Sequence, residues 1–593
     1  MTGEELHDII IELQSERADT AAVEAKRAAA GLPRSLRDTL SSFSNTPGGG
    51  VIVLGVDEEA GFAVSGITDP GKLQADFSSM CNSMVPPVRA LVDIHQVDGA
   101  HVLVAEVPEL PPSEKPCYYS GAGLVNGSYI RVGDADQRLT QYEVLMMRAN
   151  AGRPREDLLP VVEGSIGEFD TVLVDALVNH VRQREPRAFT GKSRKQTLLL
   201  LRATFEHEGK EVPTLAGWLT LAEYPQRLFP NLTVTFVHYP TSRAGELGPD
   251  GQRFIDERGF SGPLPRLIPD VMHALRVNMP KGAFAGRSFS QWPYPEDAIR
   301  ECLVNAVVHR DYSSLSSGTA VQVELYPDRL LIKSPGGLYG TVHEDQLGDE
   351  GISSTRNEAL VRLLEVIPAS DNDNPLCQNR GTGIPLMLAA LRKAKMRPPR
   401  FRDRISGFDV TIPGASLFGE ETLKWLSQFS AADLNEHQRT ALALAHSGET
   451  VTNATLRRAT GLDSRAAGGI LVQLADRGFL VQQGVTRWTT YRVAPGWKRP
   501  EEAGSADEST DARPLRKFAA LTPALRDVME LFDEHDELSR TDIERLLNLK
   551  KQATIQRLRR LHQLGLLQRT KAPRSRNVAY KKAASAENDR SSE

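Results

Sequence analysis

The chain has 593 residues and a mass of 65.1 kDa, which predicts about four domains at roughly 150 residues each. Hydrophobic residues make up 40% and charged residues 25%, a globular composition that excludes a disordered or fibrous protein. The formal net charge of -5 excludes a uniformly basic nucleic-acid coat protein but allows a local basic face. No stretch approaches the ~20 apolar residues of a membrane helix, and the charged N-terminus lacks a signal-peptide core, so we expect a cytoplasmic protein without membrane contact. The four cysteines are far apart and form no Cys-x-x-Cys pair, which favours free thiols over disulfides or a zinc finger.

The first informative stretch is a helix followed by a buried strand. Leu36, Leu40 and Phe43 recur at helical spacing, and Pro33 suits a first turn, so residues 33–46 predict a helix. A turn rich in Pro and Gly ends it. Residues 51–56 are then entirely apolar apart from one glycine, which is typical of a strand covered on both faces.

Three carboxylates flank this helix and strand. Asp57 ends the strand, while Asp19 and Glu24 precede Lys26, and in an extended segment Glu24 and Lys26 share one strand face. Carboxylates that converge near a lysine can hold a divalent metal and activate water at a phosphodiester. The alternative is that Asp19 is a turn residue, Glu24 pairs with Lys26 and Asp57 caps a turn.

These residues resemble the Schlafen-type AlbA-like domain. The resemblance rests on Asp19…Glu24-Ala25-Lys26, Asn45-Thr46…Gly49-Gly50, Gly55-Val56-Asp57, Gly66-Ile67 and Tyr129-Ile130-Arg131-Val132-Gly133. It implies an α/β nucleic-acid-binding domain in which Arg131 contacts phosphate. In nuclease members an acidic triad falls on Asp19, Glu24 and Asp57, with Lys26 beside it. This chain has Asp19 where the family has Glu and Ala25 where it has an aromatic residue.

A second motif group lies in the centre of the chain. Residues 295–310 predict an amphipathic helix on which Glu301 and Asn305, four residues apart, share a face. That pair suits an ATP site, with the amide holding Mg²⁺ and the carboxylate orienting water. Residues 321–325 and 329–333 then predict a strand hairpin, followed by a glycine turn. Residues 380–384 open another helix, whose first amides can receive phosphate.

The order of these pieces resembles the Bergerat-fold ATP-binding domain of the GHKL type, in the divergent form that accompanies Schlafen-like domains. The resemblance implies that Glu301 orients water, Asn305 binds Mg²⁺, Gly336 forms the adenine-side turn, and Gly381 and Gly383 form the phosphate lid. Departures are Ser334-Pro335-Gly336 in place of Asp-x-Gly, and Gln378-Asn379 ahead of the Gly-x-Gly. The alternative is a degenerate ATP fold that serves as a structural platform.

The C-terminal part predicts two winged helices. Each unit reads as short helices, a longer helix and a hairpin. Residues 541–593 contain 13 Lys or Arg against 5 Asp or Glu, a local charge of +8. The basic residues expected to contact nucleic acid are Lys550, Lys551, Arg557, Arg559, Arg560, Arg569, Lys571, Arg574 and Arg576. The alternative for these charges is a solvated face on a protein-interaction module.

The domain organisation predicted from these motifs is mixed α/β and α+β. Its parts are a Schlafen AlbA-like domain at 1–150, a connector at 151–290, a GHKL-like ATP-binding α/β sandwich at 291–420, winged helices at 433–496 and 516–582, a linker at 497–515 and a disordered tail at 583–593. We find no catalytic constellation in the connector.

Three functions follow from this organisation. The first is an ATP-responsive DNA-binding transcriptional regulator. The second is a metal-dependent endoribonuclease for tRNA-type substrates in phage defence, gated by ATP, with Asp19, Glu24 and Asp57 as metal ligands. The third is an interaction scaffold with degenerate sites. The expected cofactors are ATP and Mg²⁺, with Mn²⁺ as an alternative metal, and the expected partner is DNA, with RNA as the alternative; weak ATPase activity and homo-oligomerisation are left open.

Overall fold

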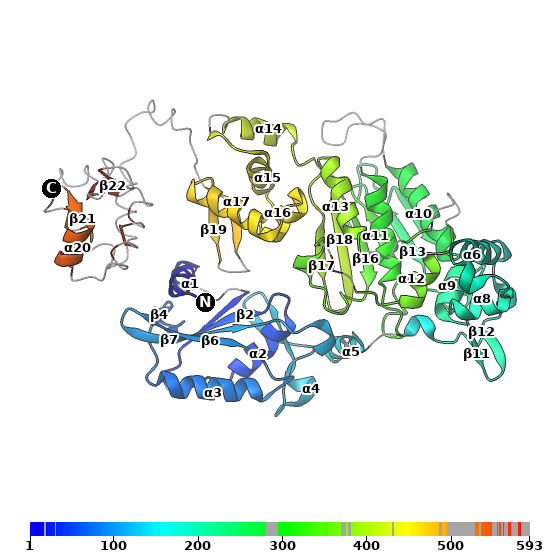
Figure 1. The fold of residues 1–593 in the computed structure, drawn as a ribbon, viewed down its shortest axis with the longest axis horizontal. Coiled ribbons are helices and arrows are strands. Elements are labelled where there is room, and N and C mark those ends of the chain that lie inside the picture. Colours follow the sequence, from blue (N-terminus) through cyan, green and yellow to red (C-terminus); the bar gives the residue numbers. More distant parts are fainter. Residues whose placement is uncertain are drawn as a thin grey trace. The chain divides into compact units, whose positions relative to one another are not determined.

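The computed structural model describes most of residues 1–494 and a smaller part of the remainder (Figure 1). Up to 494 it omits 17–18, 20, 30, 151, 153–154, 280–293, 350, 353, 369–374, 378–380, 415, 430–431 and 485–488. Beyond 494 it describes 528–529, 531–532, 535, 537–547, 554, 557–558, 561, 567–570 and 579–582. The chain divides into two compact units, Met1–Ala494 and Pro495–Glu593. Its described part is mixed α/β in several sheets, which confirms the predicted fold class.

The N-terminal region is built on a four-stranded sheet in the order β1-β2-β7-β6. Its strands are β1 (Val23–Lys26), β2 (Gly50–Leu54), β7 (Ala100–Val107) and β6 (Leu91–Val97). β1 and β2 run parallel because α2 (Leu36–Asn45) crosses between them, and the other pairs are antiparallel. α1 (Gly3–Glu16) packs on one face of the sheet, and α2 with α3 (Pro70–Asn82) packs on the other (Figure 1). Coverage of both faces explains why β2 is apolar throughout.

Short two-stranded pairs and short helices complete this region. The strands are β3 (Val56–Asp57) with β4 (Ala63–Val64), β5 (Met84–Val85) with β8 (Tyr118–Tyr119), and β9 (Tyr129–Val132) with β10 (Ala135–Arg138). The helices are η1 (Pro112–Glu114), α4 (Gly123–Asn126) and α5 (Gln141–Asn150). The predicted helix at 33–46 and strand at 51–56 are thus present as α2 and as β2 with β3.

Asn45 and Thr46, at the end of α2, connect three segments of this region. Asn45 Nδ2 donates to the carbonyls of Cys117 and Tyr129, both at 2.9 Å, and Asn45 Oδ1 accepts from the Cys117 amide at 2.7 Å. Thr46 Oγ1 accepts from the Arg131 amide at 2.9 Å. Asn45 is 1% exposed, so these bonds satisfy backbone groups that water cannot reach.

The central region contains a six-stranded sheet in the order β14-β13-β15-β16-β18-β17 (Figure 1). Its strands are β14 (Asp256–Phe260), β13 (Val234–His238), β15 (Val321–Leu325), β16 (Arg329–Pro335), β18 (Gly407–Pro413) and β17 (Arg400–Asp403). β13 and β15 are parallel, and the other neighbours are antiparallel. The predicted hairpin is present as β15 and β16. The sheet takes strands from both sides of the boundary expected at residues 290 and 291.

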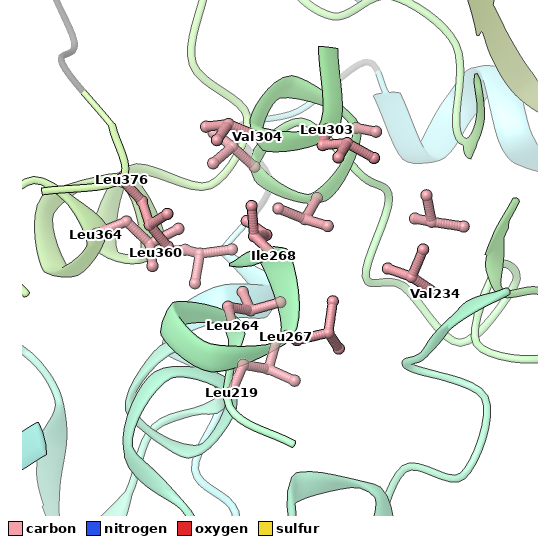
Figure 2. Close-up of a cluster of buried hydrophobic side chains, with 14 of the residues drawn as sticks. Leu219, Val234, Leu264, Leu267, Ile268, Leu303, Val304, Leu360, Leu364 and Leu376 are labelled. Carbon is pink, nitrogen blue, oxygen red and sulfur yellow. The ribbon is translucent and has the colours of Figure 1, made fainter. Parts of the chain in front are cut away.

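The helices of this region share one hydrophobic core with the sheet. They are α6 (Thr171–Arg184), α7 (Pro186–Phe189), α8 (Arg194–Leu200), α9 (Leu215–Leu221), α10 (Leu264–Asn278), α11 (Glu296–Val308), α12 (Glu358–Leu364) and α13 (Gly383–Lys393). Figure 2 shows Leu219 of α9 and Leu264, Leu267 and Ile268 of α10 beside Leu303 of α11 and Leu360 of α12. The connector and the ATP-type segment therefore form one folded body.

Smaller elements join these helices and strands. They are the hairpin β11 (Thr204–His207) with β12 (Lys210–Pro213) and the single turns η2 (Glu156–Leu158), η3 (Ile166–Glu168), η4 (Pro225–Arg227) and η5 (Glu344–Gln346).

Three helices and a hairpin follow α14 (Glu420–Ser427). They are α15 (Glu436–His446), α16 (Asn453–Thr460), α17 (Ser464–Asp476), β19 (Leu480–Gln483) and β20 (Thr490–Val493). We call α15–β20 the three-helix unit. Beyond residue 494 the described elements are β21 (Leu538–Ser539), α20 (Arg540–Leu546), β22 (Leu567–Arg569) and β23 (Ala579–Lys582), with sheet order β21-β23-β22. Among the described residues, none of the helices has the length and apolar character needed to cross a membrane.

Candidate functional site

One pocket gathers every residue that the central motifs predict to bind nucleotide. Glu301, Asn305, Gly336, Gly381 and Gly383 all line it. The two polar side chains come from α11. Gly383 is the first residue of α13 and Gly381 lies two residues before it, while strands β16 and β18 supply apolar wall residues. Residues more than 80 positions apart in the sequence therefore line one cavity. The spacing of residues within each motif could not predict this.

Glu301 and Asn305 form a hydrogen-bonded pair on the wall of this pocket. Asn305 Nδ2 donates to Glu301 Oε1 at 2.9 Å, as expected for residues one helical turn apart. Burial raises the pKa of Glu301, and the bond from Asn305 opposes part of that rise. A Cβ on Gly383 would lie 1.8 Å from Glu301 Oε1, so the carboxylate rests directly against the start of α13. Only a glycine leaves room for it there.

Gly336 forms a second part of the wall, with a left-handed backbone at φ +91°. A Cβ there would lie 2.2 Å from Arg356 Nη1 and 2.5 Å from Asp311 Cβ. Arg356 Nη2 donates to the Gly337 carbonyl at 2.9 Å and to Asn150 Oδ1 at 3.0 Å, whereas its Nε and Nη1 have no hydrogen-bond partner among the described residues. Burial lowers the pKa of Arg356. Sequence reasoning missed this residue because a single arginine in a loop carries no local signal.

The pocket fits a nucleotide with a bound metal ion. Because the Asn305 nitrogen is engaged by Glu301, the amide oxygen is the atom that Mg²⁺ could take. The amides at the start of α13 offer donors for phosphate next to Gly381 and Gly383. Apolar side chains such as Ile332, Phe408 and Val410 line the rest of the cavity, as a base requires.

Several N-terminal carboxylates gather around Lys26, and two of them, Asp19 and Glu24, belong to the predicted set. Lys26 Nζ lies 2.8 Å from Glu58, 3.1 Å from Glu24 and 3.6 Å from Asp19. Burial raises the pKa of Asp19 to about 6, although Asp19 Oδ1 accepts a hydrogen bond from the Ala25 amide. Burial alone would lower the pKa of Lys26, but Glu58 and Glu24 hold it above its usual value.

Asp57 lies against a different cation. Its carboxylate is 3.5 Å from Arg27 Nη1 and accepts from the Glu59 amide at 3.1 Å. Throughout the described part of the chain, no three His, Cys, Asp or Glu side chains are arranged to hold a metal ion. Asp57 thus pairs with Arg27, whereas Glu58 joins Asp19 and Glu24 beside Lys26, and the metal-ligand role of Asp19, Glu24 and Asp57 stays a prediction.

Arg131, the predicted phosphate contact, is buried within the domain. Its side chain is 1% exposed, with Nη2 at 2.8 Å from Glu24 and Nη1 at 2.9 Å from Asp136. Glu24 thus joins Arg131 to Lys26 and is itself only 8% exposed. In this arrangement the Arg131 guanidinium pairs with carboxylates inside the domain, and its geometry gives no support to a contact with phosphate.

Most of the predicted nucleic-acid contacts fall outside the described residues, namely Lys550, Lys551, Arg559, Arg560, Lys571, Arg574 and Arg576. Arg557 is described and is half-buried, and the backbone of Arg569 lies in β22. The linker at 497–515 and the tail at 583–593 also lie outside the described part.

Two family models match the chain. Residues 19–140 match the model described as "Schlafen, AlbA_2", which covers the N-terminal sheet and the residues around Lys26. Residues 318–412 match the model described as "Putative ATP-dependent DNA helicase recG C-terminal", which covers β15–β18 and part of the pocket. An ATPase-like region implies nucleotide binding, so the two matches together indicate an ATP-dependent function related to nucleic acid.

Solved structures give weaker likenesses, and no curated protein matches the chain. The crystal structure of the DIP2311 protein from Corynebacterium diphtheriae is 16% identical, covers 98% of this chain and 99% of that one, and has a TM-score of 0.35. The NMR structure of the N-terminal domain of a RecG-related protein from Nitrosomonas europaea is 37% identical, covers 24% of this chain and 95% of that one, and has a TM-score of 0.19. The two family models match the Schlafen-like plus ATPase-like architecture that the sequence predicts.

Proposed function

We propose that the protein is an ATP-responsive, nucleic-acid-binding regulator, with DNA as its first target. The observation that carries this proposal is the single pocket lined by all five predicted nucleotide-binding residues. A chain that kept the ATP-type fold only as a platform would have no need to hold Glu301 and Asn305 in hydrogen-bonded register beside the start of α13.

Each residue of the pocket has a defined role in this proposal. Asn305 offers its amide oxygen to Mg²⁺, and the first amides of α13 receive the phosphates. Bound Mg²⁺ would neutralise phosphate charge. Glu301, whose pKa is raised by burial, orients a water molecule and can accept its proton. The apolar wall excludes bulk water from the base.

The nucleic-acid part of the proposal rests on charge and on element order. Residues 541–593 carry a local charge of +8, while the rest of the chain is acidic. Among the described residues, α20, β21, β22 and β23 give the chain from Leu538 to Lys582 a helix and a three-stranded sheet, which suits the winged-helix interpretation. The three-helix unit has a comparable order of three helices and a hairpin.

The nuclease alternative receives less support. It needs three carboxylates at one metal, and the described structure divides Asp19 and Glu24 from Asp57 between two cations. The scaffold alternative is weakened by the preserved pocket. Regulation by nucleotide therefore ranks first.

The nucleotide part predicts separate effects for the two polar residues of α11. Asn305→Ala should remove Mg²⁺-dependent ATP binding, because the metal loses its protein ligand. Glu301→Ala should leave the dissociation constant within about threefold of wild type but stop any hydrolysis, since binding and water activation use different atoms. Titration calorimetry and a phosphate-release assay measure the two effects. Asn231→Ala, an exposed asparagine outside the pocket, is the control. A wild-type protein that binds no adenine nucleotide would favour the platform interpretation.

The nucleic-acid part predicts salt-dependent duplex binding. Replacing Arg557, Arg559 and Arg560 by alanine should weaken binding by about tenfold and flatten the salt dependence by roughly one unit of slope per lost phosphate contact. Filter binding at several salt concentrations measures both quantities. Replacing three exposed arginines near the end of α6, Arg182, Arg184 and Arg187, is the matched control. Equal loss in both triple variants would show a general charge effect and contradict a specific basic face.

A further inference from the structure

We propose that residues 342–349, here called the coupling segment, transmit nucleotide occupancy to both neighbouring parts of Met1–Ala494: the Schlafen-type domain and the three-helix unit. The inference rests on the proposed nucleotide binding and adds the route by which the protein responds. The segment lies between β16 and α12 and contains η5 (Glu344–Gln346). Its residues make three different sets of contacts within eight positions.

The first set faces the nucleotide pocket, which Val342, Leu347, Gly348 and Asp349 help to line. Gly348 has φ +106°, and a Cβ there would lie 2.4 Å from Leu388 Cδ1 of α13. The segment is thus packed closely on the helix whose first turn offers amides to phosphate. A shift of α13 on nucleotide binding would press directly on it.

The second set holds α16 of the three-helix unit. Arg457 pairs with Asp349, and its Nη2 donates to the Asp345 carbonyl at 2.9 Å. Arg458 donates to the carbonyls of Glu344 and Leu347. The Arg458 guanidinium also lies 4.9 Å from the centre of the Phe401 ring, another residue of the pocket wall. These two arginines are engaged inside the protein, which separates them from the arginines expected at nucleic acid.

The third set reaches the Schlafen-type domain through His343. His343 Nδ1 lies 3.1 Å from Glu109 Oε2. Glu109 also receives Lys115 Nζ at 2.7 Å and the Gly48 amide at 2.8 Å, in the turn that follows Asn45-Thr46. Burial alone would raise the pKa of Glu109, but His343 and Lys115 lower it to about 2, so the carboxylate is charged at neutral pH.

A segment this short cannot change one set of contacts and keep the others fixed. Closely packed elements move between discrete arrangements, because interiors do not deform continuously. A nucleotide shifts such an equilibrium by its difference in affinity for the two arrangements. Asp349 belongs to two of the three sets of contacts, since it lines the pocket and also pairs with Arg457. Occupancy of the pocket and docking of α16 are thereby linked through one carboxylate.

The test is hydrogen exchange of the full chain with and without Mg²⁺ and a non-hydrolysable ATP analogue. In wild type we expect exchange to change by about fivefold or more at the coupling segment, around Glu109 and along α16. Arg457→Ala should remove the response of α16 and keep the response around Glu109. His343→Ala should do the reverse. Arg439→Ala, an exposed arginine on α15, should leave both responses intact.

Titration calorimetry of the same variants separates this inference from the proposed function. Coupling between two sites is reciprocal. Each variant that loses an exchange response should therefore also change the dissociation constant of the analogue, by the factor with which the lost contact affected nucleotide binding. Binding of the analogue with exchange changes confined to the pocket would overturn the coupling and leave the proposed function standing. Responses lost equally in Arg457→Ala and Arg439→Ala would also overturn it. Absence of analogue binding to wild type would overturn both.

Discussion

Replacement of Gly336 by alanine is expected to abolish nucleotide binding and to destabilise the central body by roughly 2–5 kcal/mol. Gly336 has φ +91°, which L side chains rarely adopt. The new methyl group would lie 2.2 Å from Arg356 Nη1 and 2.5 Å from Asp311 Cβ. Arg356 is 2% exposed and Asp311 accepts hydrogen bonds from Ser313 and Ser316. Moving either neighbour away from the methyl group would therefore break buried contacts or hydrogen bonds.

Chemical denaturation and calorimetry together measure this expected result. Gly209→Ala is the matched control, because Gly209 has φ +75° and no atom within 4 Å of a Cβ. It should lose only about 1 kcal/mol from backbone strain. A Gly336→Ala variant that is as stable as Gly209→Ala and binds ATP normally would contradict the close contact with Arg356.

Glu24→Ala is expected to destabilise the Schlafen-type domain by about 3 kcal/mol. Glu24 is the carboxylate that meets both Arg131 and Lys26, and the Arg131 side chain is 1% exposed. Removal of Glu24 takes one carboxylate away from a buried guanidinium, which keeps its ion pair with Asp136. Breaking one side of a buried ion pair costs more than the pair contributes when intact, because the guanidinium loses the Glu24 carboxylate without gaining access to water.

Glu58→Ala is the control for this change, because Glu58 meets the same lysine but is 49% exposed. We expect it to cost less than about 1 kcal/mol. Equal unfolding free energies for the two variants would contradict the buried role of Glu24. The prediction also bears on the nuclease alternative, since loss of RNA cleavage in Glu24→Ala could reflect unfolding. Asp57→Asn tests a metal-ligand role with less disturbance, because Asp57 pairs with the exposed Arg27.

The local elements around both sites could be predicted from sequence. The helix expected at 295–310 is α11 (Glu296–Val308), and the strands expected at 321–325 and 329–333 are β15 (Val321–Leu325) and β16 (Arg329–Pro335). Such elements follow from side-chain period and turn residues, which are properties of neighbouring positions. The shared face of Glu301 and Asn305 follows from the same period.

Long-range contacts carried no comparable signal. Glu58 and Asp57 are adjacent, and which one meets Lys26 depends on how the β3 turn leaves the sheet. β13 joins β15 across more than 80 residues, so the connector could not be recognised as part of the ATP-type sheet. Arg457 and Arg458 resemble any surface pair until the fold places the coupling segment beside them.

The hydrogen bonds of Asn45 and Thr46 change what their motif can reveal. Both side chains form hydrogen bonds to backbone groups of the same domain, at Cys117, Tyr129 and Arg131. A homologue that keeps this Asn-Thr pair keeps the means of closing the domain, whatever chemistry its surface carries out. The Asn-Thr pair of the motif therefore indicates the fold of the domain. A sequence search that relies on this pair selects proteins with the same fold, whether or not they bind or cleave nucleic acid.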